Sequence, residues 1–197
     1  IPNNSMVGGL FLEMLGADVP VILQSSYNGD SASDYFIKTA IEQCGVEKQY
    51  AGFKDPVGND EIIFESYGIP MPSITRYPYE GYHSSKDNIN IISQEKLNES
   101  INVIEKMVEL IENDTYIKKH FDGVICLSNP DYDLYVDQSQ PAFQSADQTN
   151  LRQLMDHIPM IKQGEFLSRL ADRFSLDYNV VLEYIKKWEE KSLISIG

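Results

Sequence analysis

The sequence has 197 residues, of which 42% are hydrophobic and 23% charged, enough for one sizeable core and a small appended domain. The net charge of -14 argues against nucleic acid as a partner, because affinity for phosphates comes mainly from clustered lysine and arginine. No apolar run approaches the roughly 20 residues that a membrane-spanning helix needs, so no membrane partner is expected.

The start of the chain and its two cysteines bear on its cellular location. No basic-then-apolar leader is present, so no secretory signal is predicted and the expected location is the cytoplasm. Cys44 and Cys126 stand in no metal-binding or redox spacing, which favours free thiols in a reducing compartment. The chain begins with Ile1-Pro2, as expected after removal of a tag or for the C-terminal part of a longer polypeptide.

The first predicted element, residues 6–16, is an almost continuous apolar run that contains one carboxylate, Glu13. Such a run between glycines predicts a strand buried on both faces of a sheet. Glutamate is almost never fully buried unless it is paired or bound to a metal, so we expect a cationic group against Glu13. A buried salt bridge or a strand-end carboxylate that reaches solvent is one interpretation. A metal ligand at the end of a central strand is the other.

Downstream, short apolar strands alternate with amphipathic helices, which is typical of an α/β layered domain. Strands are expected at residues 19–24, 48–53 and 73–77, and helices at residues 34–44 and 94–112. The first helix should end before Gly45, and Ser93 should cap the second. The predicted apolar face of the second helix consists of Leu97, Ile101, Ile104, Val108 and Ile111.

The last part of the chain changes character. Residues 123–146 are rich in Asn, Asp, Pro and Gln and predict a connector. Three short helical segments, within residues 150–158, 164–174 and 179–193, then predict a helix-turn-helix or winged-helix layout. The predicted organisation is an α/β domain over residues 1–122, the connector, and a small helical domain over residues 147–197.

His83 is the histidine best placed for chemistry. It lies in a loop directly after a predicted strand, and Asp87 follows shortly after it. A lone histidine in such a loop is usually a hydrogen-bonded structural residue, but a neutral imidazole together with the Glu13 carboxylate is ordinary zinc chemistry. Asp87 could orient the imidazole or start the next turn. We interpret His120, near a charged helix end, and His157 as structural.

Two further charged residues have open interpretations. Asp60 is typical of a turn, and its functional alternative is an active-site carboxylate that holds a substrate amine or a ligand. Arg76, on a predicted strand, could pair with a buried carboxylate or bind a substrate carboxylate. The absence of G-x-S-x-G, P-loop, G-x-G-x-x-G and paired-cysteine motifs leaves nucleophilic serine, nucleotide and structural-zinc sites without support.

Three segments together resemble the C-terminal half of a co-catalytic zinc aminopeptidase of the bacterial leucyl-aminopeptidase and glutaminyl-cyclase type. They are LFLEMLG with Glu13, GNDEIIFESYGIPMPSITR with Asp60 and Arg76, and YHSSKDN with His83. Their order also resembles a branch that carries a C-terminal winged helix and is often assigned to polysaccharide biosynthesis. The resemblance covers most of residues 5–112 and, more loosely, residues 147–195.

The resemblance implies a partial mixed-sheet α/β fold in which Glu13 ligates one zinc ion and His83 the other. It implies that Asp60 is a carboxylate for the substrate amine or behind the ligands. Tyr82 belongs to the most specific part of the motif, and Asp87 would support the His83 loop. The complete protein would hydrolyse an N-terminal peptide or related amide bond, with two zinc ions about 3.5–4 Å apart that polarise the carbonyl and activate a bridging water.

The family's other ligands and its general-base glutamate should precede Glu13, and residues 1–12 do not supply them. A catalytic zinc site of three protein ligands is therefore not completed by Glu13 and His83 alone. We expect this chain to be part of an enzyme, with the upstream half of the same polypeptide as its partner. A catalytically silent relative that binds a ligand, a winged-helix DNA-binding regulator and a homo-oligomer stay open as alternatives.

Overall fold

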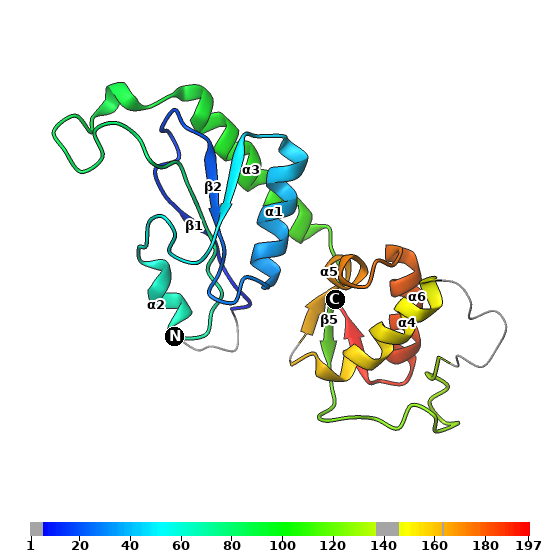
Figure 1. The fold of residues 1–197 in the computed structure, drawn as a ribbon. Helices are drawn as coiled ribbons and strands as arrows, with labels where there is room; N and C mark the ends of the chain where they lie inside the picture. Colours follow the sequence, from blue (N-terminus) through cyan, green and yellow to red (C-terminus); the bar gives the residue numbers. More distant parts are fainter. Residues whose placement is uncertain (1–5, 137–145, 163) are drawn as a thin grey trace. The chain divides into compact units, whose positions relative to one another are not determined.

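The computed structural model describes residues 6–136, 146–162 and 164–197. The chain divides into two compact units, Ile1–Asn113 and Asp114–Gly197 (Figure 1). The elements of the N-terminal unit are, in order, β1 (Phe11–Leu12), β2 (Val21–Gln24), α1 (Ala32–Cys44), β3 (Lys48–Ala51), α2 (Glu61–Glu65), β4 (Ser73–Thr75), a short 3₁₀ helix (Ile89–Ile91) and α3 (Gln94–Glu112).

The N-terminal unit is built on a mixed four-stranded sheet in the order β1-β4-β2-β3. β1 runs parallel to β4, with Phe11 opposite Ser73, and β2 runs parallel to β3 but antiparallel to β4. α1 and α3 pack against each other beside this sheet (Figure 1). The α/β class with a mixed sheet is confirmed. Its buried apolar side chains include Ile22, Leu23, Phe36, Ile37, Ile41, Ile74, Val103 and Met107.

Both long helices of this unit begin and end near where their sequence signals predict. Ser31 and Asp34 form a reciprocal capping box at the start of α1, and Gly45 ends it in the left-handed conformation at φ 65°. The Ser93 hydroxyl accepts a hydrogen bond from the Lys96 N–H and caps α3, whose bounds are the predicted ones. The capping residues in the local sequence therefore predict where these two helices begin and end.

The predicted apolar face of α3 is partly wrong. Ile101 and Val108 are each 47% exposed, whereas Ser100, Val103 and Met107 are buried. The buried stripe is rotated because Ser100 can enter it: its hydroxyl donates to the carbonyl oxygens of Lys96 and Leu15 at 2.9 and 3.2 Å. Ser100, whose hydroxyl is hydrogen-bonded, is thus buried, whereas the apolar side chains of Ile101 and Val108 are exposed.

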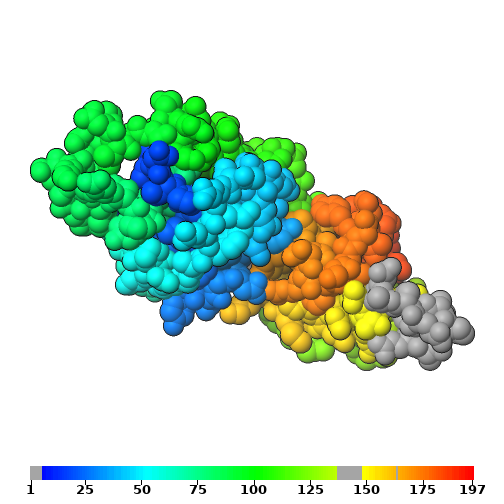
Figure 2. All heavy atoms as spheres, turned by 45° about the horizontal axis from the view of Figure 1, so that its top comes forward, coloured from blue at the N-terminus to red at the C-terminus, as the bar shows by residue number. Residues whose placement is uncertain are grey.

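The prediction that residues 6–16 form a strand buried on both faces is also wrong. Only Phe11–Leu12 form a strand, at the edge of the sheet, and Leu12 is 44% exposed. The start of the described chain, in blue, reaches the surface (Figure 2). Among the described residues β4 is the only strand that pairs with β1. The short apolar segment at residues 62–64 lies in the helix α2.

The C-terminal unit has its own antiparallel sheet and its own core. Its elements are β5 (Tyr116–Lys119), α4 (Ala146–His157), a 3₁₀ turn (Ile158–Met160), β6 (Gly164–Phe166), α5 (Leu167–Arg173), α6 (Tyr178–Glu190) and β7 (Ile194–Ile196). β5 lies between β6 and β7. Residues 114–122, which the sequence analysis placed at the end of the first domain, therefore lie in the second unit, because β5 hydrogen-bonds to both later strands.

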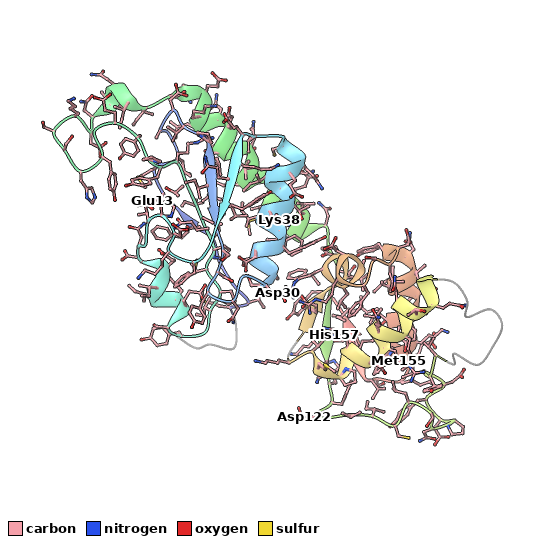
Figure 3. The ribbon with its side chains drawn as sticks, in the orientation of Figure 1. Glu13, Asp30, Lys38, Asp122, Met155 and His157 are labelled. Atoms are coloured by element: carbon pink, nitrogen blue, oxygen red, sulfur yellow. The ribbon has the colours of Figure 1, made fainter. Side chains whose placement is uncertain are left out.

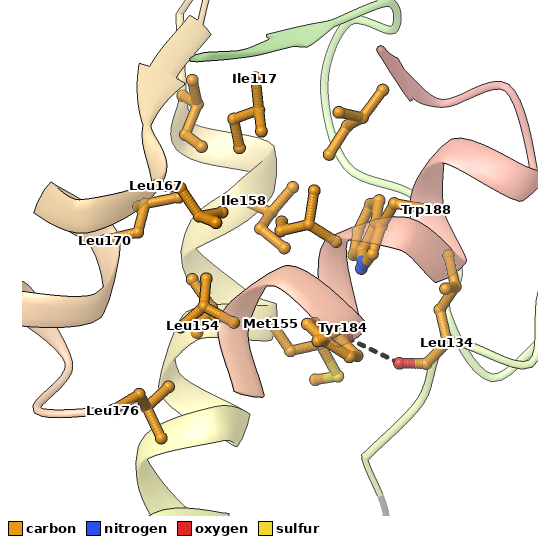
Figure 4. Packing of buried hydrophobic residues seen from close by; sticks show 14 of the residues in the cluster. Ile117, Leu134, Leu154, Met155, Ile158, Leu167, Leu170, Leu176, Tyr184 and Trp188 are labelled. Atoms are coloured by element: carbon orange, nitrogen blue, oxygen red, sulfur yellow. Dashed lines mark hydrogen bonds between the residues drawn. The ribbon is translucent and has the colours of Figure 1, made fainter. Parts of the chain in front are cut away.

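The core of the C-terminal unit is formed around Trp188, which is fully buried (Figure 4). Leu154, Ile158, Leu167 and Ile185 contribute further fully buried side chains. Tyr184 donates its hydroxyl to the Leu134 carbonyl at 2.8 Å and so holds the segment before α4 on this core. Within the part of the chain that the structure describes, no helix is both long and apolar enough to cross a bilayer.

Candidate functional site

Glu13 lies directly after β1, beside the sheet (Figure 3). Its backbone N–H donates to the Ile74 carbonyl at 3.1 Å, which fixes the residue against β4. Its side chain is half-buried, and the Asn59 amide donates to Oε2 at 2.5 Å. Among the described residues no donor contacts the other oxygen, Oε1. The carboxylate therefore has one satisfied and one open oxygen.

The surroundings of Glu13 shift the pKa of its carboxyl group. Burial raises the pKa of the Glu13 carboxyl, and the negative charge of Glu61 raises it further. The Asn59 hydrogen bond and the charge of His83 act in the opposite direction. Glu61 and His83 are thus close enough to Glu13 for their charges to be felt there, although 48 and 70 positions separate them from it in the sequence.

Glu61 is the second carboxylate of the site, and it is only 3% exposed. It opens α2, and both of its oxygens accept the backbone N–H of Asn59 at 2.9 Å. No lysine, arginine or histidine of the described chain forms an ion pair with it. Two carboxylates therefore converge without a side-chain cation between them.

His83 is exposed and is presented by a loop of aromatic residues. Its ring stacks on Tyr82, with the centroids 3.9 Å apart and the planes at 16°. Tyr82 in turn makes edge contacts with Tyr77 and Tyr79 at 5.1 and 5.6 Å. Neither imidazole nitrogen has a hydrogen bond to the described residues. The aromatic stack thus holds the ring and leaves its nitrogens available.

Asp87 supports this loop through Tyr79 rather than through the imidazole. The Tyr79 hydroxyl donates to Asp87 Oδ2 at 3.0 Å. Burial, followed by this hydrogen bond, raises the pKa of Tyr79 to about 12, and the charge of Glu13 contributes to the same shift. Tyr79 therefore lies near Glu13 as well as in the stack that carries His83. Asp87 is therefore linked to the His83 loop through Tyr79, and within the described chain it makes no hydrogen bond to the imidazole.

The backbone conformation at both ends of this site is uncommon. Met14, next to Glu13, and His83 itself have φ angles of 50° and 54°. Residues other than glycine rarely adopt this left-handed region, and such outliers concentrate at functional sites. One of these residues is His83 itself and the other adjoins Glu13, and four further non-glycine residues with positive φ lie elsewhere in the described chain.

Asp60 and Arg76 do not belong to the group formed by Glu13, Glu61 and His83. Asp60 is exposed, precedes α2 and makes no capping hydrogen bond, so its neighbour Glu61 is the residue whose charge reaches Glu13. Arg76 is fully buried and pairs with Glu99 at 2.9 Å. Of the two interpretations of Arg76, the structure supports pairing with a carboxylate.

Sequence reasoning missed Asn59, Glu61 and Tyr79. The available signal was the turn at Asn59, Asp60 and Glu61 before an apolar segment. Because that segment forms the helix α2, Glu61 is buried and Asp60 is exposed. His120, interpreted as structural, bonds through Nε2 to the Ser195 hydroxyl at 2.8 Å. Cys44 and Cys126 are free thiols, as predicted.

A metal would find only part of a ligand set here. Within residues 6–136, 146–162 and 164–197, no three or more His, Cys, Asp or Glu side chains are grouped so that they could hold a metal ion. Glu13 Oε1 and the His83 imidazole offer two of the ligand types that zinc takes. These two side chains are fewer than the three protein ligands of a catalytic zinc site.

A cavity in the C-terminal unit offers less chemistry. It encloses about 450 Å³ between residues 123–128 and α4, and its lining is mostly apolar. Its cation, Arg152, is already occupied by the Tyr135 ring at 4.6 Å, the Val136 carbonyl at 2.9 Å and Asp156 at 3.6 Å. Glu13, with one carboxylate oxygen open, is therefore the better candidate.

Comparison with known proteins gives two relatives from Clostridium acetobutylicum. A proposed polysaccharide biosynthesis protein with an aminopeptidase-like domain is 35% identical over 94 residues, which cover 45% of this chain. This chain spans only 21% of that protein. The crystal structure of a proposed peptidase matches with a TM-score of 0.53 and 20% identity, over 95% of this chain and 42% of that one. At this identity the match shows a shared fold.

A family model extends this likeness across the whole N-terminal unit. The model describes a domain of unknown function, DUF4910, and matches residues 3–114, which include Glu13, Asn59, Glu61 and His83. The match covers more than half of the 197 residues. The chain therefore belongs to the DUF4910 domain family.

Proposed function

We propose that this chain is part of a zinc-dependent aminopeptidase-like hydrolase that cleaves an N-terminal peptide or related amide bond. Glu13 and His83 would each bind one of two zinc ions. When bound, zinc would polarise the amide carbonyl and lower the pKa of a water molecule. The remaining ligands and the general-base glutamate would come from residues outside this sequence, since the chain spans a fifth to two fifths of its relatives.

The convergence at Glu13 carries this proposal. Two carboxylates and an imidazole from three separate segments lie close enough for Glu61 and His83 to shift the pKa of Glu13, and no lysine or arginine of the described residues forms an ion pair with either acid. A half-buried carboxylate with raised pKa is costly unless a positive charge arrives. A metal ion would supply that charge, and Oε1 of Glu13 is the oxygen open to it.

The chain's own residues would have distinct roles. Glu13 and His83 would bind metal, the stack of Tyr82 would orient the imidazole, and the link from Asp87 to Tyr79 would hold the loop. Glu61 and the exposed Asp60 would lie where the amino group of a substrate is expected, because carboxylates attract an ammonium group.

The C-terminal unit would serve as a packing or dimerisation domain of winged-helix type. Its α4-β6-α5-α6-β7 order supports that layout, and β5 completes the sheet. The exposed side of α6 carries Glu183, Glu189 and Glu190 against Lys186 and Lys187, a balance unsuited to phosphate contacts. DNA binding is therefore not proposed for it.

A catalytically silent relative is the second candidate. The observation in its favour is that the described residues supply no complete group of metal ligands. Such a protein would keep the fold and bind a ligand at the same carboxylates without hydrolysing it.

Zinc content separates the two candidates. The complete polypeptide that carries this chain should contain about two zinc ions per chain by mass spectrometry and should release amino acids from aminoacyl amides. His83→Ala should remove about one of these ions and lower hydrolysis at least 100-fold, because an imidazole ligand is lost.

His120→Ala is the matched control, since it removes an exposed imidazole that bonds only to Ser195 in the other unit. It should change neither zinc content nor activity. Full zinc retention in His83→Ala, with unchanged hydrolysis, would overturn the proposal. A wild-type protein without zinc or hydrolysis would favour the silent relative.

A further inference from the structure

Asn59 joins the two carboxylates of the candidate site by using both of its donors. Its side-chain amide donates to Glu13 Oε2 at 2.5 Å, and its backbone N–H donates to both oxygens of Glu61 at 2.9 Å. One residue thereby sets the position of one acid through its side chain and of the other through its main chain.

We propose that Asn59 is a positioning residue that selects which oxygen of Glu13 faces the bound cation. The inference rests on the proposed function, because it presumes that Glu13 binds a metal. With Oε2 occupied by the amide, Oε1 is the oxygen left for the ion. Carboxylates that ligate metals are commonly held in this way by a neighbouring donor, which fixes their orientation.

The orientation of the Asn59 amide follows from the contact itself. If the amide were turned over, its carbonyl oxygen would meet the Glu13 carboxylate at 2.5 Å, and two acceptors repel at that distance. The NH₂ group must therefore face Glu13. An aspartate at position 59 could not replace it, because it would bring another carboxylate beside Glu13 and Glu61.

The location of Asn59 makes it a rigid support. It lies in the turn before α2, where the Ile62 N–H approaches its carbonyl at 3.5 Å, and Glu61 is buried immediately after it.

The test compares Asn59→Ser and Asn59→Asp in the complete polypeptide, with zinc and cobalt(II) as probes. Serine suits a turn and keeps the backbone N–H for Glu61, but its short side chain does not reach Glu13. We expect zinc affinity to fall about 10–100-fold in Asn59→Ser and further in Asn59→Asp. The visible spectrum of the cobalt protein should also shift, because the orientation of a ligand changes.

The melting temperature of the metal-free protein separates positioning from a merely structural role. Asn59→Ser should leave it nearly unchanged, as should the control Asn98→Ser, which removes an exposed helical asparagine that bonds Gln94. Glu13→Gln provides the reference for losing the ligand. If Glu13→Gln weakens zinc binding but Asn59→Ser binds zinc as tightly as wild type with the same cobalt spectrum, this inference fails and the proposed function stands. If Glu13→Gln itself leaves zinc affinity unchanged, the proposed function fails.

Discussion

Two charged residues on neighbouring strands of the N-terminal unit have opposite surroundings. Arg76 follows β4 and is fully buried, and its guanidinium contacts Glu99, Ser100 and the carbonyl oxygens of Val19 and Lys96. Glu13 follows β1, is only half-buried, and has one donor on one oxygen. The more deeply buried charge is thus the better satisfied one.

This difference separates structural charge from chemically available charge. Burial of an unpaired ion is costly, so a buried guanidinium persists in a fold only where its partners are complete. Glu13 keeps a raised pKa, and its nearest charged neighbours include another acid. The complete set of partners around Arg76 identifies a constraint of the fold, whereas the incomplete set around Glu13 makes that carboxylate the candidate for chemistry.

The largest effect is expected where the partners are complete. Arg76→Met should destabilise the N-terminal unit by about 3–5 kcal/mol, because it leaves the carbonyl oxygens of Val19 and Lys96 without this donor and leaves Glu99 with Lys96 alone. Urea denaturation followed by circular dichroism would measure this. The surface ion pair of Lys106 and Glu109 on α3, the helix that carries Glu99, provides the control. Lys106→Ala should cost less than about 1 kcal/mol of folding stability.

A loss for Arg76→Met no greater than that for Lys106→Ala would contradict the structural role of the buried guanidinium. It would return Arg76 to the second interpretation, that of a group for a substrate carboxylate. The metal content of Arg76→Met is a further readout, since no contact of Arg76 with Glu13 or His83 is found among the described residues.

The helices of the N-terminal unit were the most predictable part of the fold. Ser93 and Gly45 are local signals, and the bonds that they make are local too, so α1 and α3 follow from short stretches of sequence. The convergence of Glu13 and His83 was expected only from the resemblance to a family. Composition and periodicity carried no information on it, because it depends on the order of the strands in the sheet.

The predictions that were wrong or left open depend on contacts between segments that are distant in the sequence. Whether an apolar run becomes a central or an edge strand depends on which segments pair with it, and Leu12 alone cannot show that. The choice between Asp60 and Glu61 depended on whether residues 61–65 form a helix, because that places Glu61 inward and leaves Asp60 in water. Arg76 was ambiguous because its partner, Glu99, lies on a helix 23 positions later.

A smaller, pH-dependent effect is expected at Glu99. Its hydrogen bond with Lys96, together with that from Arg76, lowers the pKa of the Glu99 carboxyl below its ordinary value of 4.5. Its contribution to stability is therefore fully present above about pH 4.5 and is lost as the pH falls through the lower, folded-state pKa. Glu99→Gln should cost about 1–2 kcal/mol at pH 7, less than Arg76→Met because Glu99 keeps contact with solvent.

Urea denaturation of Glu99→Gln and wild type at several pH values would measure this dependence. The two proteins should converge in stability as the pH falls below 4.5 and through the lower folded-state pKa, where the wild-type carboxyl also becomes protonated. A difference that persists unchanged at pH 3 would mean that the Glu99 side chain stabilises α3 by packing rather than by its charge.

The smallest effect is expected at Glu13, and its sign is reversed. Burial and the charge of Glu61 raise the pKa of Glu13 above 4.5, so its ionisation disfavours the folded state as the pH rises through the folded-state pKa. Glu13→Gln should therefore stabilise the metal-free protein at pH 7, by less than about 1 kcal/mol because the side chain is half-exposed. The gain should vanish below about pH 4.5, where both side chains are neutral.

With zinc added, the wild-type protein should become more stable than Glu13→Gln, because only the glutamate can bind the ion as an anion and binding stabilises the folded state. If Glu13→Gln instead destabilises the metal-free protein at pH 7, the carboxylate has a cationic partner of its own, and the contrast with Arg76 disappears.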